Sequence, residues 1–166
     1  GSEMCIRDRD LNSAMQNSVN WYFQAIDSQL GINRVQEFLN KIEYGNQTTS
    51  SNLDLYWSDF SLKISPLEQV TLLKKFNTNE FHLNSQNVFS VKNAIKIAST
   101  PNGNFYGKTG TGRVNGQDVN GWFIGYIETA DNTYFFATNI GADSDATGGN
   151  ATEITMSILS DMNIWK

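Results

Sequence analysis

The sequence predicts an α+β fold, in which a helical lobe is followed by three antiparallel strands and a C-terminal helix. Up to residue 99, apolar residues recur at steps of three and four, which is the helical period. After residues 100–103 the sequence becomes rich in aromatic and β-branched residues, which favour strands. Asn-Gly and Asp-Asn dipeptides separate these later stretches and are typical of hairpin turns.

Four helices are predicted before residue 100. Residues 11–30 carry apolar side chains at helical spacing, and Gly31 is a stop signal. A second helix, from residue 35 to residue 42, ends at Tyr44-Gly45-Asn46, because Gly and Asn tolerate the left-handed backbone of a turn. The polar stretch 47–58 predicts a surface loop.

The next two helices have clearer boundaries. Ser65-Pro66-Leu67-Glu68 is a helix start, with a capping Ser, Pro at the first helical position and Glu three residues after the cap. This helix is predicted to run to about residue 76. A further helix is predicted over residues 85–97.

The sheet and the last helix follow. Three strands are predicted, over residues 104–112, 119–129 and 133–140. A loop over residues 141–149 leads to a final helix over residues 150–162. Asn150 with Glu153 repeats the capping pattern at its start.

The composition excludes several classes of protein. A length of 166 residues suits one domain of roughly 100–200 residues. With 12 Lys and Arg against 17 Asp and Glu, the net charge is −5, so we expect no nucleic-acid partner. No apolar run approaches the roughly 18 residues of a membrane span, which predicts a soluble chain. A single Cys and a single His exclude a Cys- or His-based metal cluster, so no metal site is predicted.

The first nine residues are predicted to lie outside the domain. Gly1-Ser2 resembles the scar of a removed expression tag, and residues 4–9 resemble a translated sequencing adapter. The alternative is a short disordered native terminus. We therefore treat residues 1–9 as a non-native or disordered leader, assign residues 10–166 to one domain, and expect the native gene to continue upstream.

The stretch from Lys108 to Gly112 (Lys-Thr-Gly-Thr-Gly) carries the clearest chemical signal. A P-loop would need Gly where Asn102 stands and a helix directly afterwards, and a dinucleotide fingerprint would need Gly or Ala at Asn115. A glycine-rich strand that merely bends is the structural alternative. The remaining hypothesis is anion recognition with acyl transfer, in which Lys108 supplies positive potential, Thr109 binds a carboxylate and the Thr111 N–H polarises a carbonyl.

Lys-Thr-Gly is one of three motifs of penicillin-recognising serine enzymes, and Ser18-Val19-Asn20 fits a second, Ser-x-Asn. Further blocks occur in the order and approximate spacing of class D serine β-lactamases: Met15 to Tyr22, Tyr44-Gly45-Asn46, Tyr56-Trp57 ahead of Leu62 to Ser65, Gly107 to Gly112, and Gly121 to Gly125. Over residues 11–165 the chain resembles that family, and it resembles equally the penicillin-sensing domain of BlaR/MecR receptors.

The resemblance implies a β-lactamase/transpeptidase-like fold and a role for each motif residue. Ser18 would relay a proton to the β-lactam nitrogen with help from Lys108, and Asn20 would line the pocket near the acyl group. Trp57 would hold the carboxylated lysine that serves this family as general base. The substrate-binding strand would supply Thr109 for the carboxylate, Gly110, and the Thr111 backbone as half of the oxyanion hole.

The third motif, Ser-x-x-Lys, is missing, because no lysine in the sequence has a serine three residues earlier. The nucleophile and the base that becomes carboxylated are thus absent, and the family order would place them upstream of residue 1. We predict that this chain neither acylates nor turns over penicillin. The sequence departs from the class D pattern at two other points. Asn20 stands where many class D enzymes have Val but the sensors have Asn. No arginine follows Arg113, so the arginine that binds the drug carboxylate in many class D enzymes has no match.

The sequence therefore leaves three functions open. The first is a class D-like β-lactamase that, when complete, opens β-lactam rings through a serine acyl-enzyme. The second is a BlaR-type sensor domain that acylates without turnover, and the third is a transpeptidase that acts on cell-wall peptides. The first two imply β-lactam antibiotics as partners, a location outside the cytoplasmic membrane of a bacterium and no further cofactor. An upstream segment is expected to complete the sheet, so the chain alone should present a bare sheet edge.

Overall fold

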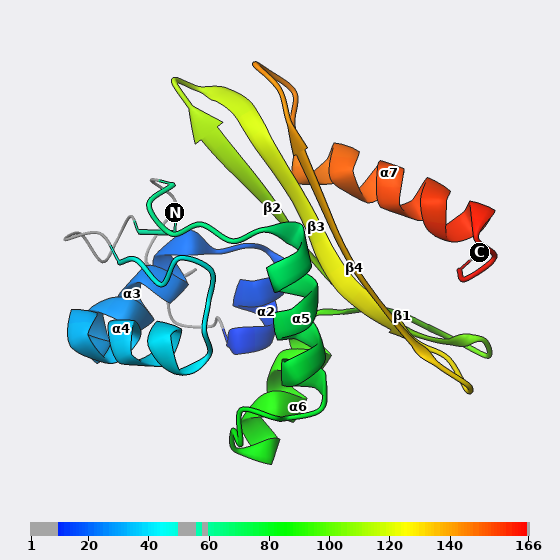
Figure 1. Cartoon of the computed structure of the whole chain (residues 1–166), viewed down its shortest axis with the longest axis horizontal. Helices are drawn as coiled ribbons and strands as arrows, with labels where there is room; N and C mark the ends of the chain where they lie inside the picture. The colour runs from blue at the N-terminus through cyan, green and yellow to red at the C-terminus, as the bar shows by residue number, and fades with distance from the viewer. Residues whose placement is uncertain (1–9, 50–55, 58–59, 166) are drawn as a thin grey trace.

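The computed structural model describes residues 10–49, 56–57 and 60–165, so the leader over residues 1–9 and part of the predicted loop 47–58 lie outside the described residues. An antiparallel sheet of four strands, in the order β1-β2-β3-β4, separates one helix from the others (Figure 1). The helices are α2 (Leu11–Gln16), α3 (Asn20–Leu30), α4 (Ile32–Lys41), α5 (Pro66–Asn77), α6 (Ser85–Ala94) and α7 (Gly148–Asp161). The strands are β1 (Lys96–Thr100), β2 (Gly103–Val114), β3 (Gln117–Glu128) and β4 (Thr133–Gly141). The predicted α+β class is confirmed.

The predicted helix over residues 11–30 is two helices. α2 ends at Gln16 and α3 begins at Asn20, with Ser18 between them in the left-handed region at a φ of 50°. The Val19 N–H donates to the Ala14 carbonyl at 2.9 Å and closes the turn. The prediction was wrong here because apolar residues keep helical spacing across the turn, and spacing carries no information about the sign of φ.

The sheet has a strand that the sequence did not indicate. α6 ends at Ala94, and Lys96–Thr100 pairs antiparallel with β2 from Lys96↔Tyr106 to Thr100↔Gly103. The predicted helix over residues 85–97 is therefore too long, and three predicted strands become four. Four of the five residues of β1 are exposed, so the strand lacks the alternation of apolar and polar residues by which strands are recognised.

Capping fixes where two of the helices begin. The predicted capping box at α5 is present: the Ser65 side chain accepts from the Glu68 N–H at 3.3 Å, and the Glu68 carboxylate accepts from the Ser65 N–H at 2.8 Å. At α7 the prediction placed the cap too late. Thr147 caps this helix by accepting from the Asn150 N–H at 3.1 Å, while the Asn150 side chain donates to the Asp145 carbonyl at 2.6 Å.

The main core lies between the sheet and α7, on the face opposite the other helices (Figure 1). Its buried members come from β2, β3, α7 and the segment after α7: Phe105, Phe123, Ile127, Ala151, Leu159 and Trp165. Burying a large apolar side chain contributes about 1.5–3 kcal/mol, so this cluster holds β2 and β3 firmly. On the other face, the rings of Tyr106 and Tyr126 stack at 4.6 Å.

The outer edge of β2 is free where its motif residues lie. β1 pairs with β2 over residues 103–106, and the Gly107 N–H still donates to the Ile95 carbonyl at 2.8 Å. From Lys108 to Val114, no strand among the described residues pairs with this edge. Among the described residues, β4 pairs with β3 alone. No described helix is long and apolar enough to cross a membrane.

Candidate active site

Ser18 and Lys108 meet at the free edge of β2. The Lys108 Nζ donates to the Ser18 Oγ at 2.5 Å and to the Thr109 carbonyl at 2.8 Å. The first of these bonds joins residues 90 positions apart in the chain. It forms because the left-handed turn between α2 and α3 brings Ser18 to the strand, which a continuous helix would not do. Two of the sequence motifs thus form one arrangement.

The Lys108 ammonium is partly buried, and this burial lowers the pKa of Lys108 from its usual value. None of the ion pairs in the described part of the chain involves Lys108. Its described hydrogen-bond partners are two neutral oxygens. Such a cation attracts an anionic ligand and can pass a proton to a neighbouring hydroxyl.

A cleft of about 510 Å³ lies between the sheet and the helical lobe. Its floor follows from the strand register, because Lys108 pairs with Ile124 and Gly110 pairs with Trp122, so all four share one face of the sheet. The full lining is Tyr44, Trp57, Phe60, Leu62, Lys63, Ile64, Gln69, Lys108, Gly110, Asn120, Trp122, Ile124 and Asn139. Of the predicted site residues, the cleft therefore contains Trp57, Lys108 and Gly110.

Thr109 and Thr111 lie on the other side of β2. Thr109 lines a smaller hollow of about 220 Å³ beside the cleft, together with Lys108 and Gln16. The Thr111 Oγ1 accepts a hydrogen bond from the N–H of Gly148, the first residue of α7, at 2.9 Å. This bond ties the edge strand to the helix packed behind it and so fixes the position of the Thr111 backbone.

Asn20 is the exposed first residue of α3 and does not line the cleft or the smaller hollow as the structure describes them. It lies two residues beyond Ser18 in the sequence. Lys108, Trp57 and Gly110 thus line the cleft, and Ser18 is held near it by the hydrogen bond from Lys108. Thr109 and Thr111 lie on the other side of β2.

The glycines around the site are required for different reasons. A Cβ on Gly125 would lie 2.0 Å from the Tyr106 carbonyl oxygen, and one on Gly107 would lie 2.7 Å from the Phe123 ring. Both positions need Gly for close packing. A Cβ on Gly110 would meet only Trp122 Cβ, at the ordinary distance of 3.6 Å, so at Gly110 a side chain would enter the cleft instead.

Sequence reasoning missed several cleft residues. Trp122, Asn120 and Asn139 could have been found from strand alternation, because β3 and β4 place them on the face of Lys108 and Gly110. Phe60 gave no signal, since it stands between the predicted loop 47–58 and the helix start at Ser65, where the sequence has no periodicity.

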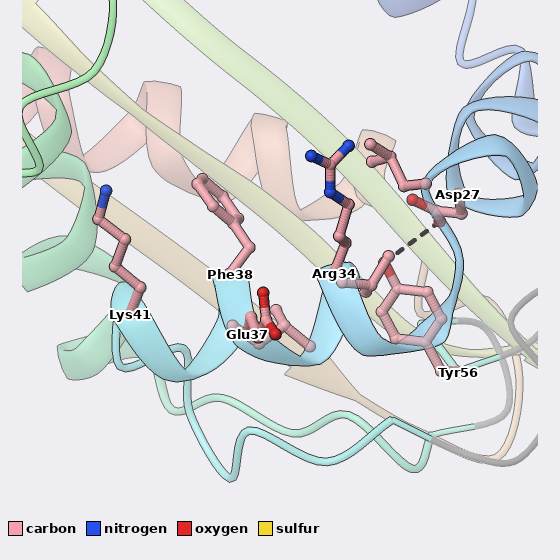
Figure 2. Close-up of a pocket in the computed structure, with 9 residues that line it drawn as sticks. Asp27, Arg34, Glu37, Phe38, Lys41 and Tyr56 are labelled. Carbon is pink, nitrogen blue, oxygen red and sulfur yellow. Dashed lines mark hydrogen bonds between the residues drawn. The ribbon is translucent and has the colours of Figure 1, made fainter.

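Another cavity, of about 400 Å³, lies in the helical lobe between α3 and α4, away from the cleft and the smaller hollow, and is called the second hollow below (Figure 2). Arg34, Glu37, Phe38 and Lys41 of α4 line it, and the Tyr56 hydroxyl donates to the Asp27 carboxylate at 3.2 Å. Burial and the nearby Asp27 charge raise the pKa of Tyr56. None of the predicted site residues lines this hollow. Among the described residues, no three His, Cys, Asp or Glu side chains are grouped so as to hold a metal ion.

The fold is shared with a solved penicillin-receptor domain and with solved class D β-lactamases. Residues 3–160 match the model of the penicillin binding protein transpeptidase domain, and the chain belongs to that family. The earlier resemblance to class D β-lactamases and to BlaR/MecR sensor domains is confirmed by the relatives below.

Three relatives show where the chain stands within the family. It is 48% identical to the regulatory protein BlaR1 of Bacillus licheniformis over 159 residues, which are 96% of this chain and 26% of that protein. The solved C-terminal domain of the Bacillus licheniformis BlaR penicillin-receptor superposes with a TM-score of 0.90 at 47% identity, covering 95% of this chain and 64% of that one. A class D β-lactamase from Bacillus subtilis superposes with a TM-score of 0.87 at 35% identity, with coverage of 95% and 64%. The chain thus spans about a quarter of the curated relative and about two thirds of the solved domains.

Proposed function

We propose that the chain is the ligand-recognition part of a domain that binds β-lactam antibiotics, and that the complete protein opens the β-lactam ring through a serine acyl-enzyme. The observation that carries this proposal is the hydrogen bond from Lys108 Nζ to Ser18 Oγ at the free edge of β2. This contact supports the proposal, because ring opening requires a proton donor and a proton relay near the ligand.

In the proposed reaction, the serine oxygen of the complete protein's Ser-x-x-Lys motif would attack the β-lactam carbonyl, and the proton of that serine would pass to the lysine-derived base of the same motif. The bond between the carbonyl carbon and the ring nitrogen then breaks. The nitrogen takes a proton from the Ser18 hydroxyl, which is reprotonated by the Lys108 ammonium. The lowered pKa of Lys108 supports this role, because a weaker hold on the proton favours transfer.

The remaining residues bind the ligand in this proposal. Thr109 receives the ligand carboxylate, Gly110 leaves room for the ring, and the Thr111 N–H polarises the carbonyl. Trp57 lines the cleft and would contact the carboxylated lysine of the complete site. The resemblance implies a position near the acyl group for Asn20, although this residue does not line the described cleft.

The 166 residues contain no Ser-x-x-Lys, so we propose that the chain itself binds β-lactams without forming a covalent bond. Incubation of the purified chain with nitrocefin and with a fluorescent penicillin tests this. We expect no nitrocefin turnover above buffer and no labelled band after denaturing electrophoresis. Saturable turnover would contradict the proposal.

A sensor domain is the second candidate, and the 48% identity to BlaR1 favours it. Asn20 also favours it, because a polar side chain at this motif position is expected to disfavour the lysine carboxylate and slow deacylation. A pulse of fluorescent penicillin on the complete protein, followed by a chase, separates the two candidates: an acyl signal that persists indicates a sensor, and one that decays quickly indicates an enzyme. A transpeptidase would transfer the acyl group of a cell-wall peptide instead. The enzyme and the sensor candidates both imply a location outside the cytoplasmic membrane.

A further inference from the structure

Phe60 has an unusual backbone and lies in the cleft. Its φ is 64°, in the left-handed region that bulky side chains rarely adopt. Its side chain lines the cleft together with Trp57, although 38% of the residue stays exposed. Bulky residues persist in this conformation where the surrounding structure holds them, and such positions cluster at functional sites.

The Phe60 ring lies against Gly112 of β2. A Cβ on Gly112 would come within 2.8 Å of Phe60 Cε1 and 2.9 Å of Phe60 Cζ. A Cβ at Gly110, two residues earlier on the same face, would contact only Trp122 Cβ at 3.6 Å. The cleft is therefore open over Gly110 and covered by an aromatic ring over Gly112.

This difference along β2 gives the cleft a direction. In the proposed function, the ligand lies along the outer edge of β2, with its carboxylate at Thr109 and its reacting carbonyl at the Thr111 N–H. The part of the ligand on the far side of that carbonyl then extends toward Gly112, where the Phe60 ring lies. In a penicillin this part is the acylamino side chain, which varies in size between drugs while the fused ring system stays constant.

We propose that Phe60 is a specificity-determining residue, whose ring over Gly112 limits the size of the acylamino side chain that the cleft accepts. This inference rests on the proposed function. The ring selects by steric exclusion, so removing it should improve the binding of large ligands and leave small ones unaffected.

Two penicillins that share one nucleus test the proposal: 6-aminopenicillanic acid, which has no acyl side chain, and piperacillin, which has a large one. NMR titration of the purified chain measures both Kd values for the native sequence and for Phe60→Gly. We expect the piperacillin Kd to fall by about fivefold or more, the scale on which pocket size discriminates, while the Kd of 6-aminopenicillanic acid changes by less than about twofold. Equal changes for both ligands, or none, would overturn the inference.

Two variants sharpen this test. Gly112→Ala should push the ring into the cleft and weaken piperacillin more than 6-aminopenicillanic acid, and Phe60→Gly in the same chain should reverse that effect. Phe38→Ala is the matched control, because Phe38 is 45% exposed and lies in the second hollow. A selectivity change in the control equal to that of Phe60→Gly would also overturn the inference.

The outcomes separate this inference from the proposed function. If the native chain binds neither penicillin, the proposed function fails, and this inference fails with it. If the native chain binds 6-aminopenicillanic acid and the Phe60 variants leave the selectivity unchanged, only this inference fails.

Discussion

The Nζ of Lys108 lies 2.5 Å from the Oγ of Ser18, and this contact joins the helical lobe to the edge of the sheet. It depends on the left-handed backbone of Ser18, which is where α2 gives way to α3. Left-handed backbone costs a residue with a side chain roughly 1–2 kcal/mol relative to its favoured conformation. A strained backbone and a hydrogen-bonded hydroxyl thus lie at one residue, and substitutions can separate their effects.

Ser18→Ala and Ser18→Gly both remove the hydroxyl, but only Gly relieves the backbone strain. We expect both variants to weaken binding of 6-aminopenicillanic acid to a similar extent. The Ser18→Gly variant should be more stable than Ser18→Ala by about 1 kcal/mol. Urea unfolding measures the stability difference, and NMR titration measures the affinities. Native affinity in Ser18→Ala would show that the hydroxyl takes no part in ligand binding.

The lowered pKa of Lys108 predicts how binding depends on pH. A ligand carboxylate is held by the protonated lysine, so affinity should fall as the pH rises through the pKa of Lys108. Because burial lowers that pKa, the fall should begin at a lower pH than an ordinary lysine would give. Titrations at a series of pH values from about 7 to 10 measure this. Affinity that stays constant over the range would contradict the assignment of Lys108 as the anion-binding cation.

The same shift makes a separate prediction for stability. Burial favours the neutral form in the folded state, so between the lowered pKa and the usual value the unfolded chain binds more protons. Stability contributed by Lys108 should therefore rise with pH across that window. Urea unfolding of the native chain and of Lys108→Met gives the difference between the two at each pH. If the native chain instead becomes less stable relative to Lys108→Met as the pH rises, the prediction is contradicted.

Two glycine substitutions distinguish the cleft from the core. Gly125→Ala places a Cβ 2.0 Å from the Tyr106 carbonyl oxygen and should cost about 2–3 kcal/mol or prevent folding. Gly110→Ala meets only ordinary contacts and should change stability by less than about 0.5 kcal/mol. Its methyl group enters the cleft, so we expect ligand affinity to fall by about tenfold. Thermal unfolding measures the stability of both variants, and titration measures the affinity of Gly110→Ala. Unchanged affinity in Gly110→Ala would show that the ligand does not lie over Gly110.

The outer edge of β4 should make the chain self-associate, because its backbone has no strand partner on that side among the described residues. Sedimentation velocity at increasing concentration should show growth in apparent mass. Hydrogen exchange should show that the amides of β4 become better protected over the same range. A chain that stays monomeric, with β4 amides exchanging rapidly at every concentration, would contradict this expectation.

Much of the fold was predictable because it rests on local signals. The capping box at Ser65 and the Asn115-Gly116 turn specify their elements within a few residues. The break at Ser18 and the strand β1 were not predictable, because they depend on tertiary contacts. Ser18 is held by Lys108, and β1 is held by its pairing with β2. Local periodicity reports neither.

The residues of the candidate site were likewise predictable only in part. The motifs singled out Ser18 and Lys108 as candidates, and the structure shows their side chains in contact. Phe60 lay beyond prediction, because its role depends on a ring that crosses from a loop to Gly112 on the sheet. Long-range side-chain contacts of this kind leave no pattern in the sequence around either residue.

One measurement tests the central claim most directly: a titration of the ¹⁵N-labelled chain with benzylpenicillin, followed by two-dimensional NMR. We predict saturable shifts at the amides of Ser18, Lys108, Thr109 and Thr111 and at the indole of Trp57, with unchanged signals at Arg34 and Phe38. Shifts confined to the hollow between α3 and α4, or no shifts at all, would contradict the assignment of the β2 edge as a β-lactam site.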